Sequence, residues 1–248
     1  MFHINIRRLS ICSFNVLILL LFIFFSGSDL YGIKQGLSGQ LPVKVNQQDT
    51  LIENQNLFNG RIWRNLYYLS EGNQFLFSNE FLPGSLTING KRFTDIFLKY
   101  DIYNDEILTP VDQGGILQLN KEMVDSFSLS FQDKTYKFIK MQDDSIKGSK
   151  KYFSVLYHGK TALYLKYTKK IDKLTINGEN EKFYQFRRIY FVKDNVIYLI
   201  NSKSDLIMAL IEKKEMIKPF IKKNRLYVSE KEPESFIPVI RYYDSLSH

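Results

Sequence analysis

Four carboxylate residues lie within a short stretch near the middle of the chain, at Asp101, Asp105, Glu106 and Asp112. Carboxylate oxygens are ligands that Ca²⁺ prefers in proteins, so a calcium site is one chemistry that this group can support. The spacing does not match the EF-hand pattern, and apolar and aromatic residues separate the acids. We therefore interpret the group as the polar end of a strand followed by a solvated turn, and we predict no metal site.

Paired carboxylates also catalyse glycoside hydrolysis, in which two carboxyl groups face each other across a cleft. The sequence alone does not show which two acids would do so. Asp143 and Asp144 are adjacent, but they lie in a polar segment that we expect to be a solvated loop. A carbohydrate-active hydrolase is therefore only the third of the functions that we consider.

Nucleophilic catalysis needs a nucleophile, a base and a group that orients the base. His158 is followed by Gly159, and this pair is predicted to lie at the tip of a hairpin, which by itself supplies neither partner. The chain after the N-terminal leader has no G-x-S-x-G or S-x-x-K serine motif and no glycine-rich phosphate loop. We predict that the protein is not an enzyme and that it has no catalytic residues and no cofactor.

Aromatic residues are a further indication of a binding surface. The chain has 16 Tyr and 20 Phe, and tyrosine rings at the rim of a site contact carbohydrate or protein well. The alternative, which we favour, is that the rings form cross-strand pairs that cover and stabilise a sheet face. The aromatic residues considered for a rim are Trp63, Tyr67, Tyr68, Phe97, Tyr103, Tyr164, Tyr184 and Tyr190.

The net charge of +8 comes from basic residues that are spread along the chain. Adjacent basic pairs occur at Lys150-Lys151, Lys169-Lys170, Arg187-Arg188 and Lys222-Lys223, with acids between them. No dense basic stripe is present, so we predict that nucleic acid is not a partner. The pairs are interpreted as a solvated surface, and attraction to an anionic membrane or an acidic glycan is the second interpretation.

The N-terminus has the pattern of a secretory signal peptide. Arg7 and Arg8 precede an apolar run at Val16–Phe25, and small residues follow, so residues 1–28 are predicted to be cleaved after Ser28. The run is shorter than the roughly 20 residues that span a bilayer, so no membrane span is expected after cleavage. The only cysteine, Cys12, lies at the head of the run, so the mature chain is expected to form no disulfide. We predict export to the periplasm or the cell surface.

The remaining chain is predicted to divide into an irregular lead-in at 29–59, an antiparallel β domain at 60–201 and a helical element at 202–248 that packs on it. Within the β domain, Lys91–Pro110 alternates apolar and charged residues, which predicts one long, half-buried strand. Asn89-Gly90 just before it predicts a tight hairpin turn.

Other strand-sized segments recur between turn signals, which favours a meander sheet, either a sandwich or an incomplete barrel. Pro83-Gly84 is predicted to be one of the turns. The predicted strands are Gln74–Ser78, Ser85–Ile88, Ile116–Leu119, Ser126–Phe131, Thr135–Met141, Tyr152–Tyr157, Thr161–Lys169, Leu174–Ile176, Lys182–Val192 and Val196–Ile200.

The periodicity changes at Ser202, which with Asp205 resembles a helix N-cap. Pro219 is expected to break or kink the helix that follows, and a second helix is predicted from about Glu234 with Pro233 at its start. The residues predicted to form the apolar faces of the two helices are Leu206, Leu210, Ile217, Ile221, Phe236, Ile240 and Tyr243.

Three stretches carry a resemblance: KYDIYNDEIL at Lys99–Leu108, YFSVLYHGKTALYLKY at Tyr152–Tyr167 and VIRYYDSL at Val239–Leu246. Together they resemble a group of exported bacterial β-rich proteins that have a signal peptide, a basic helical tail and no assigned activity. The resemblance implies the same architecture and brings no catalytic residues with it.

These observations lead to three hypotheses about function. The first is an exported, non-enzymatic binding or structural module of the cell envelope, whose partner is a protein, glycan or lipid. The alternative is a carrier of an apolar ligand or lipid inside a half-open β-barrel. The third is the carbohydrate-active hydrolase.

Overall fold

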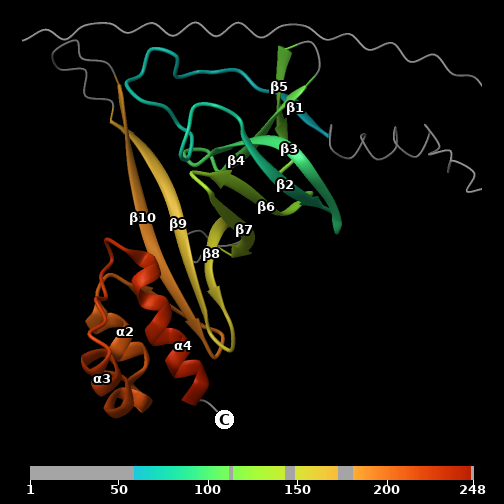
Figure 1. The fold of residues 1–248 in the computed structure, drawn as a ribbon. Coiled ribbons are helices and arrows are strands. Elements are labelled where there is room, and N and C mark those ends of the chain that lie inside the picture. Colours follow the sequence, from blue (N-terminus) through green and yellow to red (C-terminus); the bar gives the residue numbers. More distant parts are fainter. Residues whose placement is uncertain (1–58, 112–113, 143–148, 173–180, 247–248) are drawn as a thin grey trace, which may run out of the picture. The chain divides into compact units, whose positions relative to one another are not determined.

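Strands pair in an almost sequential order to form one antiparallel sheet (Figure 1). The computed structural model describes residues 59–111, 114–142, 149–172 and 181–246. Within these residues, the order of the 11 strands is β1-β5-β4-β3-β2-β6-β7-β8-β9-β10-β11, and three short helices follow. The predicted leader, nearly all of the lead-in, Asp112, Asp143-Asp144 and Leu174–Ile176 lie outside the described residues.

The prediction of a mainly β protein with an antiparallel meander sheet and C-terminal helices is confirmed, and the sheet is not closed. No helix in the described residues is long and apolar enough to cross a membrane. The strands are β1 (Gly60–Ile62), β2 (Leu82–Ile88), β3 (Lys91–Asp101), β4 (Glu106–Val111), β5 (Gly115–Leu119), β6 (Val124–Phe131), β7 (Lys134–Gln142), β8 (Lys150–His158), β9 (Ala162–Asp172), β10 (Lys182–Lys193) and β11 (Val196–Ile200), and the helices are α2 (Lys203–Ala209), α3 (Lys214–Lys223) and α4 (Ile237–Leu246).

The prediction of one long strand at Lys91–Pro110 is wrong, because the stretch forms a hairpin of β3 and β4. The Asp101 carboxylate accepts hydrogen bonds from the backbone N–H groups of Tyr103 and Asn104, both at 2.9 Å. An aspartate that binds the backbone two residues on initiates a turn, and Asp105 completes it with a φ of 61°. The hairpin predicted at Asn89-Gly90 does form, with both residues at positive φ.

Two further predictions of local structure are wrong. Pro83-Gly84 lies inside β2, where a Cβ on Gly84 would come within 2.1 Å of the carbonyl oxygen of Ser128, so glycine lets β6 approach closely. Gln74–Ser78 is not a strand. Phe77 takes a φ of 65°, which an extended strand does not allow.

Residues Glu71–Phe77 instead form a strap, a segment that connects β10 with the end of β3. At one end, the N–H of Phe183 donates to the carbonyl of Glu71 at 3.1 Å. At the other end, the N–H of Leu76 donates to the carbonyl of Tyr100 at 2.9 Å. The strap therefore holds together two strands that are far apart in the order of the sheet.

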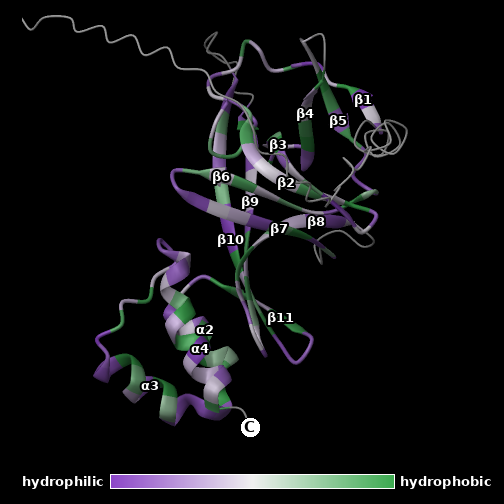
Figure 2. Cartoon of the chain, turned by 45° about the vertical axis from the view of Figure 1, so that its right-hand side comes forward, coloured by the Kyte–Doolittle hydropathy of each residue, from purple (hydrophilic) through white to green (hydrophobic). Residues whose placement is uncertain are grey.

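Aromatic side chains fill the concave side of the curled β2–β8 region. The rings of Phe127 and Phe138 stack at 4.6 Å, and Tyr100 and Tyr152 each meet Phe127 edge to face at 5.1 Å. These four residues are at most 3% exposed. Along β6, hydrophobic and hydrophilic residues alternate as a sheet with one buried face requires (Figure 2).

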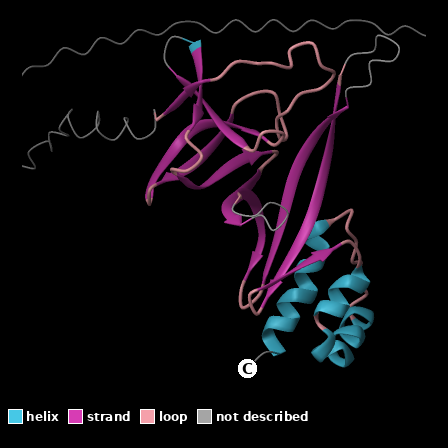
Figure 3. Cartoon of the chain, turned by 180° about the vertical axis from the view of Figure 1, so that it is seen from behind, coloured by secondary structure: helices cyan, strands magenta, loops and turns pink. Residues whose placement is uncertain are grey.

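The helices cover one half of the long β9–β10 hairpin and β11 (Figure 3). Ser202 accepts a hydrogen bond from the N–H of Asp205 at 3.2 Å, so the predicted N-cap is confirmed. The expected break at Pro219 is wrong: the chain leaves the α-helix between Ala209 and Lys214, and Pro219 lies inside α3. Pro219 is in the sixth position of α3 and has no N–H to donate to the carbonyl of Glu215. The residues that pack together in this half include Leu163, Leu165, Phe191, Leu206, Ile217, Phe236 and Ile240.

A buried carboxylate on α4 joins this helix to the turn between β8 and β9. Asp244 accepts hydrogen bonds from Tyr157 Oη at 2.9 Å and from the Oγ1 and N–H of Thr161 at 2.8 and 3.1 Å. A Cβ on Gly159 would come within 2.5 Å of the same carboxylate, so glycine is needed for this close approach. The contact positions the helical element on the hairpin.

Replacing Asp244 by alanine removes this acceptor and leaves the N–H of Thr161 buried without its partner. We expect Asp244→Ala to lower the free energy of unfolding by about 3 kcal/mol, because each buried unsatisfied group costs about 1–3 kcal/mol. Tyr157→Phe removes a single donor and should cost about 1 kcal/mol. Urea denaturation measures both changes, and an Asp244→Ala protein as stable as the wild type would contradict this role.

A second polar contact joins the end of β10 to the helices. The carboxylate of Glu212 accepts hydrogen bonds from Lys193 Nζ at 2.5 Å and from Tyr243 Oη at 2.6 Å. Burial alone would raise the pKa of Glu212, but these two donors outweigh it and lower the pKa from 4.5 to about 2. The contact therefore stabilises the fold only while Glu212 is ionised.

A pH series tests this contact. Because the pKa of Glu212 is depressed in the folded state, its contribution is fully present above about pH 4.5 and is lost as the pH falls through about 2. We expect Glu212→Gln to lower the free energy of unfolding at pH 7 by at most about 1 kcal/mol, since the group is partly exposed to solvent. The difference between variant and wild type should shrink in acid. A difference that stays constant down to pH 2 would show that the charge of Glu212 does not matter.

Candidate functional site

Strands β8 and β9 pair near their shared turn and then separate, and we call this divergence the fork. Their pairing ends at Ser154 and Leu165. Beyond it, the β3–β4 turn enters the space between them, with the N–H of Lys169 donating to the carbonyl of Ile102 at 3.2 Å. The fork therefore arises because β9 exchanges its neighbour β8 for a turn from a distant part of the chain.

A pocket of about 260 Å³ lies in the fork, and we call it the fork pocket. Among the residues that the structure describes, its lining contains cations from three strands, tyrosines, and a single carboxylate, that of Asp105. The cationic residues are Lys151 of β8, Lys166, Lys169 and Lys170 of β9, and Arg188 of β10, and the tyrosines are Tyr103, Tyr167 and Tyr190.

The register of the sheet brings several of these cations to one face. Arg188 lies directly opposite Lys166, and residues opposite each other in an antiparallel pair share a face. The ammonium of Lys166 lies 5.1 Å from the ring centroid of Phe153, which is on the same face of β8 as Lys151. Phe153 also meets Tyr190 edge to face at 5.4 Å. The convex face of the fork thus combines positive charge with aromatic rings.

Lys169 has a structural role at the edge of the pocket. Its ammonium donates to the backbone carbonyls of Asn73 and Phe75, each at 2.7 Å, and so binds the strap to β9. Burial lowers the pKa of Lys169, although the charge of Asp101 acts in the opposite direction. Of the remaining cations of the lining, Lys170 and Arg188 are exposed, Lys151 is half-buried and Lys166 is buried.

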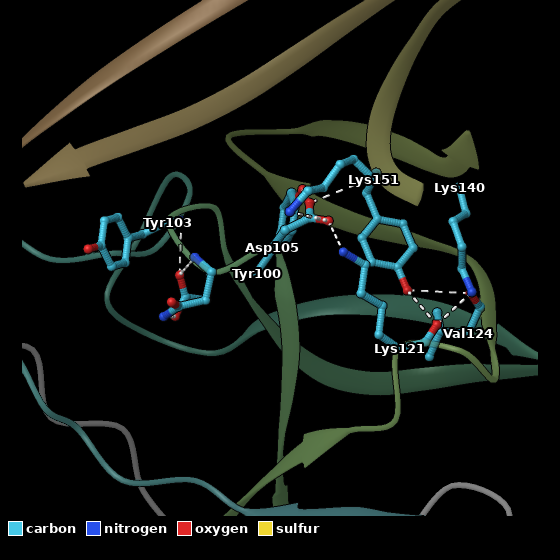
Figure 4. Close-up of polar contacts among 10 residues, drawn as sticks. Tyr100, Tyr103, Asp105, Lys121, Val124, Lys140 and Lys151 are labelled. Carbon is cyan, nitrogen blue, oxygen red and sulfur yellow. Dashed lines mark hydrogen bonds and ion pairs between the residues drawn. The ribbon is translucent and has the colours of Figure 1, made fainter. Parts of the chain in front are cut away.

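Asp105 forms the floor of the pocket and is held from several directions (Figure 4). It accepts a hydrogen bond from Tyr100 Oη at 2.6 Å and one from the N–H of Tyr152 at 3.4 Å, and it forms an ion pair with Lys121. Lys151 Nζ lies 4.0 Å from the same carboxylate. Burial, reinforced by the charge of Asp105, raises the pKa of Tyr100 well above its usual value, so this hydroxyl keeps its proton.

The carboxylates that the sequence places together are separated by the fold. Asp101 is 0% exposed and holds the β3–β4 turn, and burial raises its pKa although hydrogen bonds from Asn104 and Tyr103 oppose the shift. Glu106 lies near Arg61, at 3.5 Å. No three metal-ligating side chains gather in the described part of the chain. The interpretation of this group as a strand end followed by a turn is confirmed for Asp101 and Asp105, but the turn is not solvated there, because both carboxylates are buried acceptors that shape the hairpin.

The other residues singled out in the sequence fall in different places. His158 is exposed at the end of β8. Tyr164 is buried at 6% exposure, whereas Tyr68, Phe97 and Tyr184 are exposed. Tyr103 and Tyr67 pack with Phe183 in an edge-to-face cluster. Of the eight aromatic residues considered for a rim, Tyr103 and Tyr190 line the fork pocket.

The signal that sequence reasoning undervalued is the set of basic pairs. Lys150-Lys151, Lys169-Lys170 and Arg187-Arg188 each contribute at least one residue to the fork pocket, although they lie far apart in the sequence. Because two successive strand residues point to opposite faces, one member of such a pair always reaches a given face. Lys222-Lys223 lies at the end of α3, away from this set.

Another hollow, of about 330 Å³, lies beside β1 and includes Arg61, Trp63, Tyr67 and Glu106. Its lining carries fewer cations, and it borders the start of the described residues. The fork pocket is therefore the stronger candidate site. Comparisons with protein-family models, curated proteins and solved structures gave no match for this chain.

The floor of the pocket provides a direct test of its construction. Asp105→Ala leaves the buried hydroxyl of Tyr100 without its acceptor and leaves Lys121 without the carboxylate that balances its charge. We therefore expect the free energy of unfolding to fall by about 3–5 kcal/mol. Asp105→Asn keeps an acceptor and tolerates the positive φ, so it should cost less. Glu230→Ala, at an exposed position of the turn after α3, serves as control and should change stability by no more than about 0.5 kcal/mol. If Asp105→Ala changes the free energy of unfolding no more than the control does, the floor of the pocket does not depend on this carboxylate.

Proposed function

We propose that the protein is a non-enzymatic binding module of the cell envelope, exported by its N-terminal leader, and that it binds an anionic group of its ligand in the fork pocket. The observation that carries the proposal is the convergence of cations from β8, β9 and β10 around one pocket. Among the described residues, the lining has five cationic side chains and one carboxylate, that of Asp105, which forms ion pairs with Lys121 and Lys151. Such a pocket attracts anions by the sign of its potential.

The chemistry of the lining supports binding rather than catalysis. The described histidine, His158, lies at the exposed end of β8 and does not line the pocket. Asp105 is fixed by its hydrogen bonds and its ion pair, which hold it as a structural acceptor. A general base needs to reach a proton on the substrate, and nothing orients Asp105 for this.

The alternative function, an apolar carrier, needs an internal cavity. Tyr100, Phe127, Phe138 and Tyr152 occupy the concave side of the curled sheet and pack against one another. A ligand there would have to displace this aromatic core. The third function, hydrolysis by two carboxyl groups, is not favoured, because Asp101 and Asp105 are both engaged in the β3–β4 turn.

Titration with glucuronate and with inorganic phosphate, followed by amide chemical shifts of the full chain, tests the proposal. We expect shifts at the fork, and a 10- to 100-fold loss of affinity in Lys151→Gln/Arg188→Gln, because a hydrogen bond to a charged group contributes roughly 1.5–3 kcal/mol. The matched control is Lys222→Gln/Lys223→Gln, which removes the same charge from the end of α3 and should bind as the wild type does. Absence of binding by the wild type, or equal losses in both variants, would refute the proposal.

A further inference from the structure

The convex face of β9–β10 continues beyond the fork pocket as a row of alternating cations and aromatic rings. The register places Arg188 opposite Lys166, Phe186 opposite Thr168 and Tyr184 opposite Lys170. Since opposite and alternate residues share a face, these side chains follow the pocket along the same surface. We call this surface, formed by Lys166, Lys170, Tyr184, Phe186 and Arg188, the outer stripe.

The outer stripe is exposed at Lys170, Tyr184, Phe186 and Arg188, whereas Lys166 is buried. Tyr184 and Phe186 are 44% and 48% exposed, and they lie where β10 pairs with β9 alone, because β11 pairs with β10 only from Ile189 to Lys193. The ammonium of Lys170 lies 5.5 Å from the centroid of the Phe186 ring. The backbone positions of the two residues are about 7 Å apart along the strand, because alternate residues are separated by two rises of about 3.4 Å. This spacing offers repeated contacts to an extended ligand.

We infer that the outer stripe binds an acidic polysaccharide, a glycan with carboxylate or sulfate groups, one of which occupies the fork pocket. This inference rests on the proposed function and extends it from a single anionic group to a chain of sugars. Tyr184 and Phe186 contact the apolar faces of sugar rings, and Lys170 and Arg188 bind the acidic groups between them.

The distribution of charge favours a glycan over a nucleic acid. At the far end of the stripe, Asp172 lies opposite Lys182, and Lys182 forms an ion pair with Glu71. A single nucleic-acid strand carries a phosphate at every nucleotide and would place negative charge beside these acids. A glycan in which neutral and acidic groups alternate avoids this repulsion.

The test compares a hyaluronan hexamer, in which glucuronate alternates with a neutral sugar, with glucuronate alone, using the full chain and calorimetric titration. We expect the hexamer to bind at least about tenfold more tightly than the monosaccharide. Tyr184→Ala/Phe186→Ala should abolish this gain, because each aromatic contact contributes roughly a factor of two to ten. The same variant should bind glucuronate as the wild type does. Tyr68→Ala/Tyr227→Ala, which removes two exposed rings elsewhere, should bind the hexamer normally.

The outcomes separate the two proposals. The outer stripe is not a glycan site if glucuronate binds at the fork but the hexamer binds no more tightly. The same conclusion follows if the aromatic variant still binds the hexamer more tightly than glucuronate. If the wild type binds neither glucuronate nor the hexamer, the proposed function fails as well. If a twelve-residue oligothymidylate binds more tightly than the hexamer, and the aromatic variant loses this binding, the ligand is a nucleic acid and the proposal of a glycan is wrong. Should the aromatic variant fail to fold, Tyr184→Ser provides a second variant, which is expected to weaken binding of the hexamer but not of glucuronate, because Tyr184 does not line the fork pocket.

Discussion

A buried carboxylate, Asp105, is the contact on which the geometry of the fork depends. A negative charge inside a protein is tolerated only when donors and cations surround it. The partners of Asp105 come from β3, from the segment after β5 and from β8, so satisfying this one group brings three parts of the chain together. The β3–β4 turn is thereby fixed between β8 and β9, and the two strands cannot stay paired along their full length.

The two halves of the long β9–β10 hairpin have different surroundings. Near the β8–β9 turn, Leu163, Leu165 and Phe191 pack against the helices, and Asp244 holds α4 to the turn. Toward the other end, β9 no longer pairs with β8, and the β9–β10 hairpin carries the exposed cations and rings of the outer stripe. Packing and hydrogen bonds in the first half stabilise the hairpin. The outer stripe in the second half can therefore stay exposed.

The elements that sequence reasoning predicted correctly are those specified by neighbouring residues. Asn89-Gly90 adopts the two positive φ values of a tight turn, and the Ser202 side chain caps α2 through the N–H of Asp205. Alternation in the β6 segment predicts its buried Phe127 and Leu129. The predictions failed where a side chain acts on the backbone in a way that periodicity does not record. Asp101 ends β3 in the middle of an alternating run, and a positive φ at Phe77 prevents a strand in the strap.

By itself, therefore, the sequence determined the antiparallel strands, most of their turns and the amphipathic helices, because each depends on contacts a few residues apart. It also supplied the basic pairs and the tyrosines of the candidate site. Only the tertiary structure decided which of these residues meet. The convergence of Lys151, Lys166 and Arg188 depends on the register of β9 with β10 and on the point where β8 leaves β9. The second depends on the β3–β4 turn, which Asp105 ties to β8 and Ile102 to β9, and no local pattern indicates that Asp105 is buried.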